Sequence, residues 1–253
     1  MRSYSRILVA PGSVEGVLRI TLNRPEKRNA IDGLSIEELG HALGAAKDSR
    51  VIVIAGAGKD FCSGADLASL QQIRDAGPLE NMDDARRMAD LFRAMRAHPR
   101  PIIAAVHGRA LAGGCGLASA CDLVLAAESA TFGYPEVNIG FVPAMVMAIL
   151  RRNVSEKLAF EWIAMGQPIA SKDACSAGLV NRVFPDETFP AEVDQFAATL
   201  AQKSMSALSL CKNLLYHMDG VPFDTAIEMG VHGNGIARLT EDCRSGIDRF
   251  LSR

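Results

Sequence analysis

The stretch ALAGGCGL, residues 110–117, follows a short apolar run at residues 102–106 (IIAAV) and precedes a second one at residues 123–126 (LVLA). Gly113 and Gly114 lack a Cβ atom, so the chain can turn tightly and another group can approach its backbone closely. We expect a buried strand before the turn and a helix after it, whose first N–H groups and dipole would favour negative charge. In isolation, a Gly-Gly turn is more often only a strand-to-helix connection.

Further strand and helix patterns on both sides of this stretch predict an α/β core. Residues 17–23 (VLRITLN) alternate between apolar and polar side chains, and residues 51–55 (VIVIA) form a β-branched run. Residues 35–47 have the apolar spacing of a helix, with Ser35 as its candidate N-cap, and residues 82–98 repeat that spacing. Units spaced in this way are typical of a mostly parallel sheet covered by helices.

The last quarter of the chain changes to a wholly helical pattern. We therefore divide the chain near residues 186–190 into an α/β core, residues 1–190, and a C-terminal helical region, residues 191–253. The candidate helices of the second part cover residues 191–203, 207–218 and 223–238.

Composition and charge exclude several classes of function. Among the 253 residues, 49% are hydrophobic and the formal net charge is −2, so nothing attracts nucleic acid or an anionic membrane in general. The most apolar stretch, residues 141–150, is too short to span a membrane, and the first ten residues are too polar for a signal peptide. The six cysteines show no C-x-x-C spacing, so we expect reduced thiols, no metal site and a cytoplasmic protein.

A second glycine turn, FCSGADL at residues 61–67, supplies another candidate hydrogen-bond donor. No G-x-S-x-G elbow surrounds Ser63, and spacing assigns no histidine to it, so a serine nucleophile is not expected. The N–H of Ala65, just after the glycine, is the better candidate. We interpret Asp66 as a local cap and the thiol groups of the two turns, Cys62 and Cys115, as buried.

A single acid, Glu136, lies in the mostly apolar segment FGYPEVNIG at residues 132–140. Apolar neighbours would partly desolvate its carboxylate and raise the pKa toward a value useful for proton transfer. The alternative is an exposed loop carboxylate. The neighbours expected around it are Phe132, Tyr134, Val137 and Phe141.

Together, two turns with free N–H groups and one nearby acid can hold a developing oxyanion and move a proton beside it. The chain resembles the crotonase superfamily (enoyl-CoA hydratases and isomerases) from about residue 14 to residue 251. The resemblance implies a crotonase-like α/β spiral of β-β-α units followed by a C-terminal helical trimerisation region, in a homotrimer or homohexamer. Its elements are the three motifs above together with NRPEKRNA (residues 23–30), GRALAGGCGLASACD (108–122) and AGLVNRV (177–183).

Carried over residue by residue, the resemblance makes the N–H groups of Ala65 and Gly113 the two donors to a thioester oxygen. Glu136 falls on the second acid position of the family, whereas the first falls on Gly116, which has no side chain. With one carboxylate the simplest chemistry is a proton shuttle, so we favour double-bond isomerisation of an enoyl-CoA. Two alternatives stay open: an enoyl-CoA hydratase that adds water to 2-enoyl-CoA, and a non-catalytic acyl-CoA-binding protein.

The resemblance also implies how coenzyme A binds. Lys27 and Arg28 would lie near its phosphates or adenine, while Ala65 and Leu67 would line the turn at the adenine end. The alternative for the two basic residues is a solvated loop. Coenzyme A is then part of the substrate, and no separate cofactor is expected.

Overall fold

The computed structural model describes residues 3–252, apart from the side chains of Leu67 and Leu70. Its main sheet has the strand order β1-β2-β3-β4-β6-β9. β1 pairs antiparallel with β2, and the other neighbours pair in parallel, which confirms the predicted mostly parallel α/β core. The strands are β1 (Ile7–Pro11), β2 (Val17–Leu22), β3 (Val51–Gly56), β4 (Ile102–Val106), β6 (Leu123–Ala127) and β9 (Arg182–Phe184).

A second, smaller sheet lies beside the main one, and the chain passes between the two sheets in a spiral. It contains β5 (Arg109–Leu111), β7 (Thr131–Gly133) and β8 (Ile169–Ala170). The chain runs from β4 in the main sheet to β5 in the small sheet and then into a helix, and β6 and β7 repeat this order. These are the β-β-α units that the resemblance implies. Strands of two or three residues are too short to show an alternating pattern, so the sequence did not reveal the second sheet.

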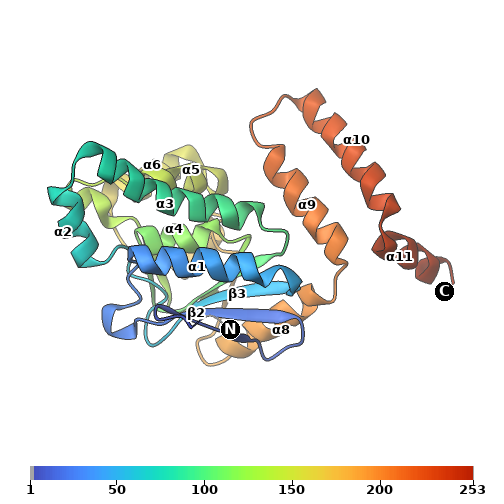
Figure 1. The fold of residues 1–253 in the computed structure, drawn as a ribbon, viewed down its shortest axis with the longest axis horizontal. Coiled ribbons are helices and arrows are strands. Elements are labelled where there is room, and N and C mark those ends of the chain that lie inside the picture. The colour runs from blue at the N-terminus through green and yellow to red at the C-terminus, as the bar shows by residue number, and fades with distance from the viewer. Residues whose placement is uncertain (1–2, 253) are drawn as a thin grey trace.

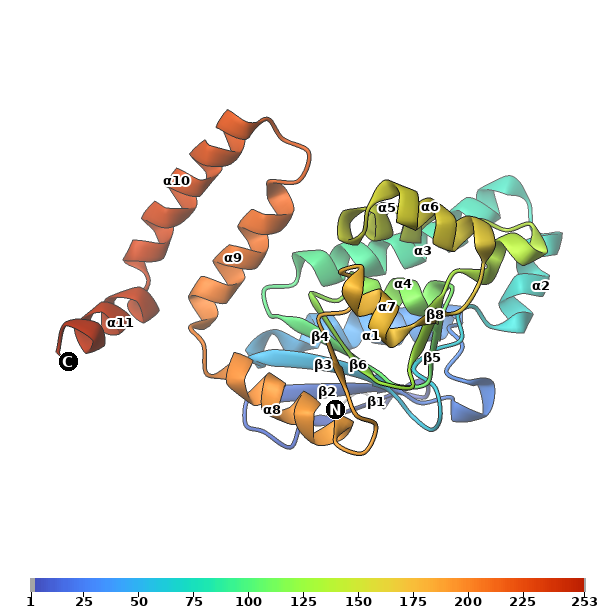
Figure 2. The same ribbon diagram turned by 180° about the vertical axis from the view of Figure 1, so that it is seen from behind.

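Helices cover both faces of the main sheet (Figures 1 and 2). α1 (Gly33–Ala45), α3 (Pro78–Ala97) and α4 (Gly113–Ala120) lie on one face, and α8 (Phe189–Ala201) lies on the other. Val193 and Ala197, four residues apart on one side of α8, are buried against the sheet. α8 belongs by sequence to the C-terminal helical region but packs on the core, and the division at residue 190 stays a prediction.

Three C-terminal helices extend away from the core, and we call them the C-terminal arm: α9 (Met205–His217), α10 (Phe223–Leu239) and α11 (Glu241–Leu251) (Figure 1). α9 and α10 are confirmed close to their predicted bounds. The sequence did not predict α11, a helix in which charged residues separate a few apolar ones.

Two local predictions need correction. Asp32, not Ser35, is the N-cap of α1: its Oδ1 accepts a hydrogen bond from the Ser35 N–H at 2.8 Å, and Ser35 is the third helical residue. The helix expected over residues 82–98 begins earlier, as α3 at Pro78, and α2 (Leu67–Asp75) precedes it. Pro78 begins α3 because proline is tolerated in the first helical turn.

The remaining elements connect these layers. They are α5 (Ala144–Asn153), α6 (Glu156–Met165), α7 (Ser171–Ser176) and the 3₁₀ turns η1 (Pro25–Lys27), η2 (Ala46–Asp48) and η3 (Pro135–Ile139).

Candidate active site

The two glycine turns lie side by side because the first one extends the small sheet. The Cys62 N–H donates to the carbonyl oxygen of Arg109 at 2.9 Å, and the Leu111 N–H donates to the carbonyl oxygen of Cys62 at 2.9 Å. A Cβ atom on Gly64, whose φ is +97°, would lie 2.9 Å from the Cβ atom of Ala112. Turns that are distant in the sequence therefore meet at one edge of the small sheet.

Gly113 and Gly114 serve different purposes in the second turn. A Cβ atom on Gly114 would lie 2.5 Å from the carbonyl oxygen of Cys62 and 2.7 Å from its Sγ, so this glycine permits the contact between the turns. For Gly113 the nearest such contact is the Cε atom of Met88, at 3.9 Å. The backbone at Gly113 thus borders space rather than packed atoms.

Two backbone donors at these turns are unpaired. Among the described residues, neither the Ala65 N–H nor the Gly113 N–H has a hydrogen-bond acceptor. Gly113 is the first residue of α4, so its N–H has no partner within the helix and lies at the positive end of the helix dipole. The arrangement offers two N–H groups from adjacent turns to an anionic oxygen.

The residue before the second donor has a strained backbone. Ala112 has φ 51° and ψ −127°, a backbone conformation that residues with a Cβ atom rarely adopt. Its N–H donates to the carbonyl oxygen of Gly133 in β7 at 2.8 Å, which ties the turn to the neighbouring strand. Such strain costs about 1–3 kcal/mol and clusters at functional sites. This backbone strain could not be predicted from the sequence, because alanine has no particular preference for such a conformation.

Glu136 lies on η3, just after β7, and is only 8% exposed. Burial raises the pKa of its carboxyl group, and Oε2 has no hydrogen-bond partner among the described residues. This confirms the prediction of a desolvated acid rather than an exposed loop carboxylate. Of the expected neighbours, Phe132 and Tyr134 are fully buried, whereas Val137 and Phe141 are partly exposed.

Glu136 is held near the donors by the small sheet. β7 pairs with β5, so the strand that leads to Glu136 runs beside the strand that leads to the second turn. Burial, with a smaller contribution from the charge of Glu136, raises the pKa of Cys115 to about 11. Cys115 lies in the first turn of α4, so the acid and the Gly113 donor approach the same helix end.

The other reactive groups near the turns are already engaged or inert. Asp66 caps α2, accepting a hydrogen bond from the Ala68 N–H at 2.8 Å, which confirms its predicted role as a local cap. Cys62 and Cys115 are fully buried, as expected, and burial raises the pKa of Cys62 to about 12. A thiol with so high a pKa is not a nucleophile at neutral pH.

Apolar atoms fill the space beside Gly116. A Cβ atom there would lie 2.5 Å from Cγ2 of Val146 and 3.2 Å from Cζ of Phe92. Val146 comes from α5 and Phe92 from α3, and both are buried. The position to which the resemblance assigns a first acid therefore has no carboxylate, and Val146 and Phe92 leave little room for one.

The basic loop borders the first turn. Lys27 and Arg28 are exposed at η1, and the carbonyl oxygen of Arg28 accepts a hydrogen bond from the Ser63 N–H at 3.0 Å. The basic loop and the first glycine turn are therefore neighbours in the structure. Leu67 begins α2, but its side chain lies outside the described residues.

Residues 3–252 also lack two features that other classes of protein would need. They show no group of three or more His, Cys, Asp or Glu side chains placed to hold a metal ion. Likewise, no helix in this part of the chain is long and apolar enough to cross a membrane. The expected cytoplasmic location stays a prediction.

Comparison with known proteins identifies the family. Residues 12–253 match the sequence profile of the family described as enoyl-CoA hydratase/isomerase. A Thermus thermophilus protein with the provisional name enoyl-CoA hydratase is 37% identical over 92% of this chain and 94% of its own. The 2,3-dehydroadipyl-CoA hydratase of Escherichia coli is 35% identical over 94% of this chain and 92% of its own.

Solved structures give the same result. An enoyl-CoA hydratase from Mycobacterium smegmatis superimposes with a TM-score of 0.93 at 29% identity, covering 98% of this chain and 96% of that one. Human enoyl-CoA hydratase domain-containing protein 3 superimposes with a TM-score of 0.90 at 28% identity, covering 98% of both chains.

Proposed function

Because the chain belongs to the enoyl-CoA hydratase/isomerase family, we propose that it isomerises the double bond of an enoyl-CoA with Glu136 as its single acid–base group. The thioester oxygen would accept hydrogen bonds from the N–H groups of Ala65 and Gly113. Both N–H groups lack a partner among the described residues, and Glu136 has a free Oε2 and a raised pKa, which supports these roles.

The proposed reaction balances with one carboxylate. Ionised Glu136 takes a proton from C2 of a 3-enoyl-CoA, and the electron pair that is left forms an enolate with its charge on the thioester oxygen. The two N–H groups stabilise that charge. Protonated Glu136 then returns the proton to C4 as the double bond moves to C2–C3, which regenerates the carboxylate.

The apolar packing beside Gly116 is the observation that favours isomerisation over hydration. Val146 and Phe92 place hydrocarbon where a second carboxylate would help to activate and orient water. Of the other acids near the turns, Asp66 is bound to Arg24 and Asp60 to Arg109, so neither is available as a base. One proton carrier in apolar surroundings favours a shuttle within the substrate.

Hydration of 2-enoyl-CoA is the second candidate, because the relatives reported above carry the name hydratase. The two reactions are separated by incubating the protein with 2-enoyl-CoA and 3-enoyl-CoA of several chain lengths and identifying the products. We expect 3-enoyl-CoA to give 2-enoyl-CoA, with little 3-hydroxyacyl-CoA. Efficient hydration without isomerisation would overturn the proposal, and no turnover of either substrate would favour a non-catalytic acyl-CoA-binding protein.

Isotope transfer tests the shuttle directly. Since Glu136 is almost completely buried, a deuteron taken from C2 should exchange slowly with solvent and reappear in part at C4. The measurement is mass spectrometry of the product formed in ordinary water from substrate deuterated at C2. Complete loss of the label would contradict transfer by a sheltered carboxyl group.

Restoring the missing acid provides a complementary test. Gly116→Glu alone should overpack against Val146 and cost about 1–3 kcal/mol of stability. The double variant Gly116→Glu/Val146→Ala should relieve that contact and raise the ratio of hydration to isomerisation. The side chains closest to a Cβ atom at position 116 are those of Val146 and Phe92.

We also propose that Lys27 and Arg28 bind the phosphates of coenzyme A, and that Ala65 and Leu67 line the turn at its adenine end. Support comes from the exposed position of the basic loop and its hydrogen bond to the first turn. Replacing both basic residues with Gln should raise KM for acyl-CoA and leave kcat nearly unchanged.

For the C-terminal arm we propose a role in forming a homotrimer or homohexamer. The arm exposes apolar side chains that its own helices leave uncovered, which is typical of an interface. They are Leu215, Phe223, Ile227, Val231, Ile236, Leu239, Ile247, Phe250 and Leu251.

A further inference from the structure

We propose that Arg24 is a positioning residue that fixes and polarises the Ala65 N–H. It acts through two peptide groups that a hydrogen bond joins, the one between Ala30 and Ile31 and the one between Gly64 and Ala65. The inference rests on the proposed function, since it concerns one of the two donors to the thioester oxygen. It assigns a purpose to a largely buried guanidinium that is remote in the sequence from both glycine turns.

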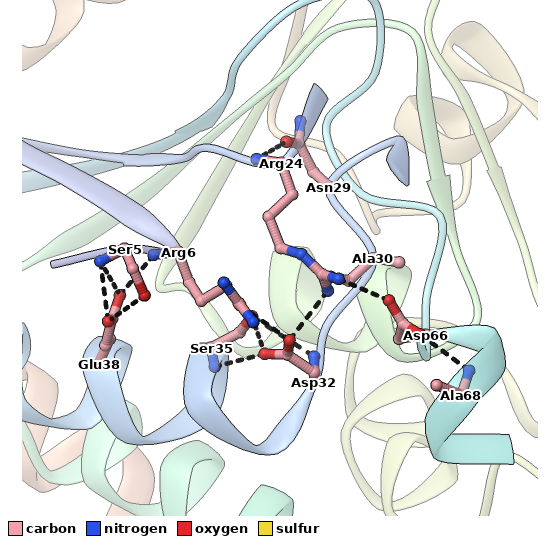
Figure 3. A network of polar contacts seen from close by, with 10 residues as sticks. All are labelled: Ser5, Arg6, Arg24, Asn29, Ala30, Asp32, Ser35, Glu38, Asp66 and Ala68. Carbon is pink, nitrogen blue, oxygen red and sulfur yellow. Dashed lines mark hydrogen bonds and ion pairs between the residues drawn. The ribbon is translucent and has the colours of Figure 1, made fainter. Parts of the chain in front are cut away.

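Arg24 has three acceptors around its guanidinium (Figure 3). Nη1 donates to the carbonyl oxygen of Ala30 at 2.7 Å and lies 3.2 Å from Oδ2 of Asp32, while Nη2 donates to Oδ2 of Asp66 at 2.7 Å. The side chain is only 13% exposed. A guanidinium is a fork of five donors in one plane, so these contacts hold it in a single orientation.

The contact with Ala30 begins a chain of hydrogen bonds that ends at the donor. The carbonyl group of Ala30 and the N–H of Ile31 belong to one peptide plane, and that N–H donates to the carbonyl oxygen of Gly64 at 2.8 Å. The carbonyl group of Gly64 and the N–H of Ala65 form the next peptide plane. In a trans peptide the C=O and N–H point in opposite directions, so the Ala65 N–H points away from Ile31.

Arg24 also secures the far side of Ala65. The Asp66 N–H donates to the carbonyl oxygen of Ile31 at 2.9 Å, so the residues before and after Ala65 are both bound to Ile31. Asp66 is held in turn by Arg24 and by the Ala68 N–H. These hydrogen bonds lower the pKa of Asp66, the one from Ala68 most, so the carboxylate remains charged against the guanidinium.

The positive charge acts along the same chain. A charged donor on the Ala30 carbonyl polarises that peptide and makes the Ile31 N–H a stronger donor, which polarises the Gly64 peptide in its turn. Cooperative strengthening of this kind is about 10–30% per bond. At the end of the chain, the Ala65 N–H would bind a developing oxyanion more strongly than an isolated peptide N–H.

Arg6 supplies a matched control within the same network. Its Nε donates to Oδ2 of Asp32 at 2.8 Å, so it shares one acceptor with Arg24 (Figure 3). Among the described residues, its side chain makes no hydrogen bond to Ala30 or Asp66, and it is 33% exposed. Loss of Arg6 therefore removes a charge from the network without breaking the chain of peptide groups.

The test is the infrared carbonyl band of butyryl-CoA labelled with ¹³C at the thioester carbon, a saturated probe that does not react. Bound to the unaltered protein, the band should move to lower frequency because two N–H groups polarise the carbonyl. Arg24→Met should lose a clear part of that movement and lower kcat about tenfold with KM changed less than about threefold. Arg24→Lys should fall between them, since a point charge cannot hold all three acceptors. Arg6→Met should retain the full movement.

Each outcome decides a separate question. A band that does not move in the unaltered protein would contradict the oxyanion hole and hence the proposed function. Movement in the unaltered protein that is fully retained in Arg24→Met or in Arg24→Lys would overturn the role of Arg24 alone, as would an equal loss in Arg6→Met. Thermal unfolding of each variant identifies any that does not fold; if Arg24→Met fails, the Arg24→Lys spectrum decides.

Discussion

The α/β core and the C-terminal arm use apolar residues in opposite ways. In the core, every residue of β3 and β4 is buried, and helices cover both faces of the main sheet. In the arm, large apolar side chains are left in contact with solvent; Phe223 and Phe250, for example, are 77% and 76% exposed. The strands of the core are thus buried within one chain, whereas the arm leaves large apolar side chains exposed.

Polar contacts join the two regions. Lys212 of α9 is buried, and its Nζ donates to the carbonyl oxygen of Met95 at 2.9 Å and to Oδ2 of Asp122 at 2.8 Å. The hydroxyl of Tyr216, one turn later, donates to Oδ1 of Asp122 at 2.7 Å. Burial lowers the pKa of Lys212. The arm is therefore attached to the core by a small polar cluster at α9, and catalysis and assembly should be separable by mutation.

The largest expected effect comes from removing the proton carrier of the core. Glu136→Gln should lower kcat by about 10²–10⁴ and leave the fold and the mass of the assembly unchanged. Steady-state assays with 3-enoyl-CoA measure the loss, and the exposed Glu187→Gln serves as the control. Activity near that of the unaltered protein would move the chemistry to another residue.

The unaltered protein also has a pH profile that depends on Glu136. Burial raises its pKa above the ordinary value of 4.5, and the first step needs the ionised form. kcat/KM should therefore fall as the pH drops through this raised pKa, so the acid limb should lie above pH 4.5. An acid limb at or below 4.5 would argue against a desolvated base.

A side chain beside the second donor should have the next largest effect. Gly113→Val adds a branched group where the thioester approaches and should lower kcat by about 10²–10³. Gly113→Ala is the graded control, because its Cβ would lie 3.9 Å from Cε of Met88 and fits without overlap. If both variants turned over normally, the turn would be structural only.

Breaking the attachment between core and arm should act on stability and assembly. Lys212→Met leaves Asp122 without its cation and should lower the free energy of unfolding by about 3 kcal/mol. Chemical denaturation measures this change, with the exposed Lys203→Met as the control. An unchanged midpoint in Lys212→Met would show that the ion pair between Lys212 and Asp122 does not help to hold α9 in place.

The smallest effect on folding is expected at the tip of the arm. Phe250→Ser removes an exposed side chain and should change the free energy of unfolding of the isolated chain by no more than about 0.5 kcal/mol. Sedimentation should nevertheless show weaker assembly, with the chemistry of the core retained. A single-chain mass for the unaltered protein would contradict the proposed trimer or hexamer.

Local features of the site could be predicted from sequence because each depends on neighbouring residues. Asp66 caps the helix that begins at the next residue, and Gly113 starts a helix at the end of a strand–turn unit. The burial of Glu136 followed from the apolar residues on both sides of it, although Val137 and Phe141 proved partly exposed. Choosing Ser35 instead of Asp32 as a cap was wrong, because both residue types suit that position and only the helix geometry selects one.

The sequence by itself determined the parallel α/β core, the family, the two turns and the acid, since these are encoded in short motifs and in periods of two or 3.6 residues. The tertiary structure alone decided which atoms fill the space beside Gly116, how Ala112 is strained, and which peptide groups join Arg24 to Ala65. Those outcomes depend on contacts between residues far apart in the chain, such as Arg24 with Asp66 and Gly116 with Val146. Packing distances of a few tenths of an ångström decide such contacts, and no local pattern records them.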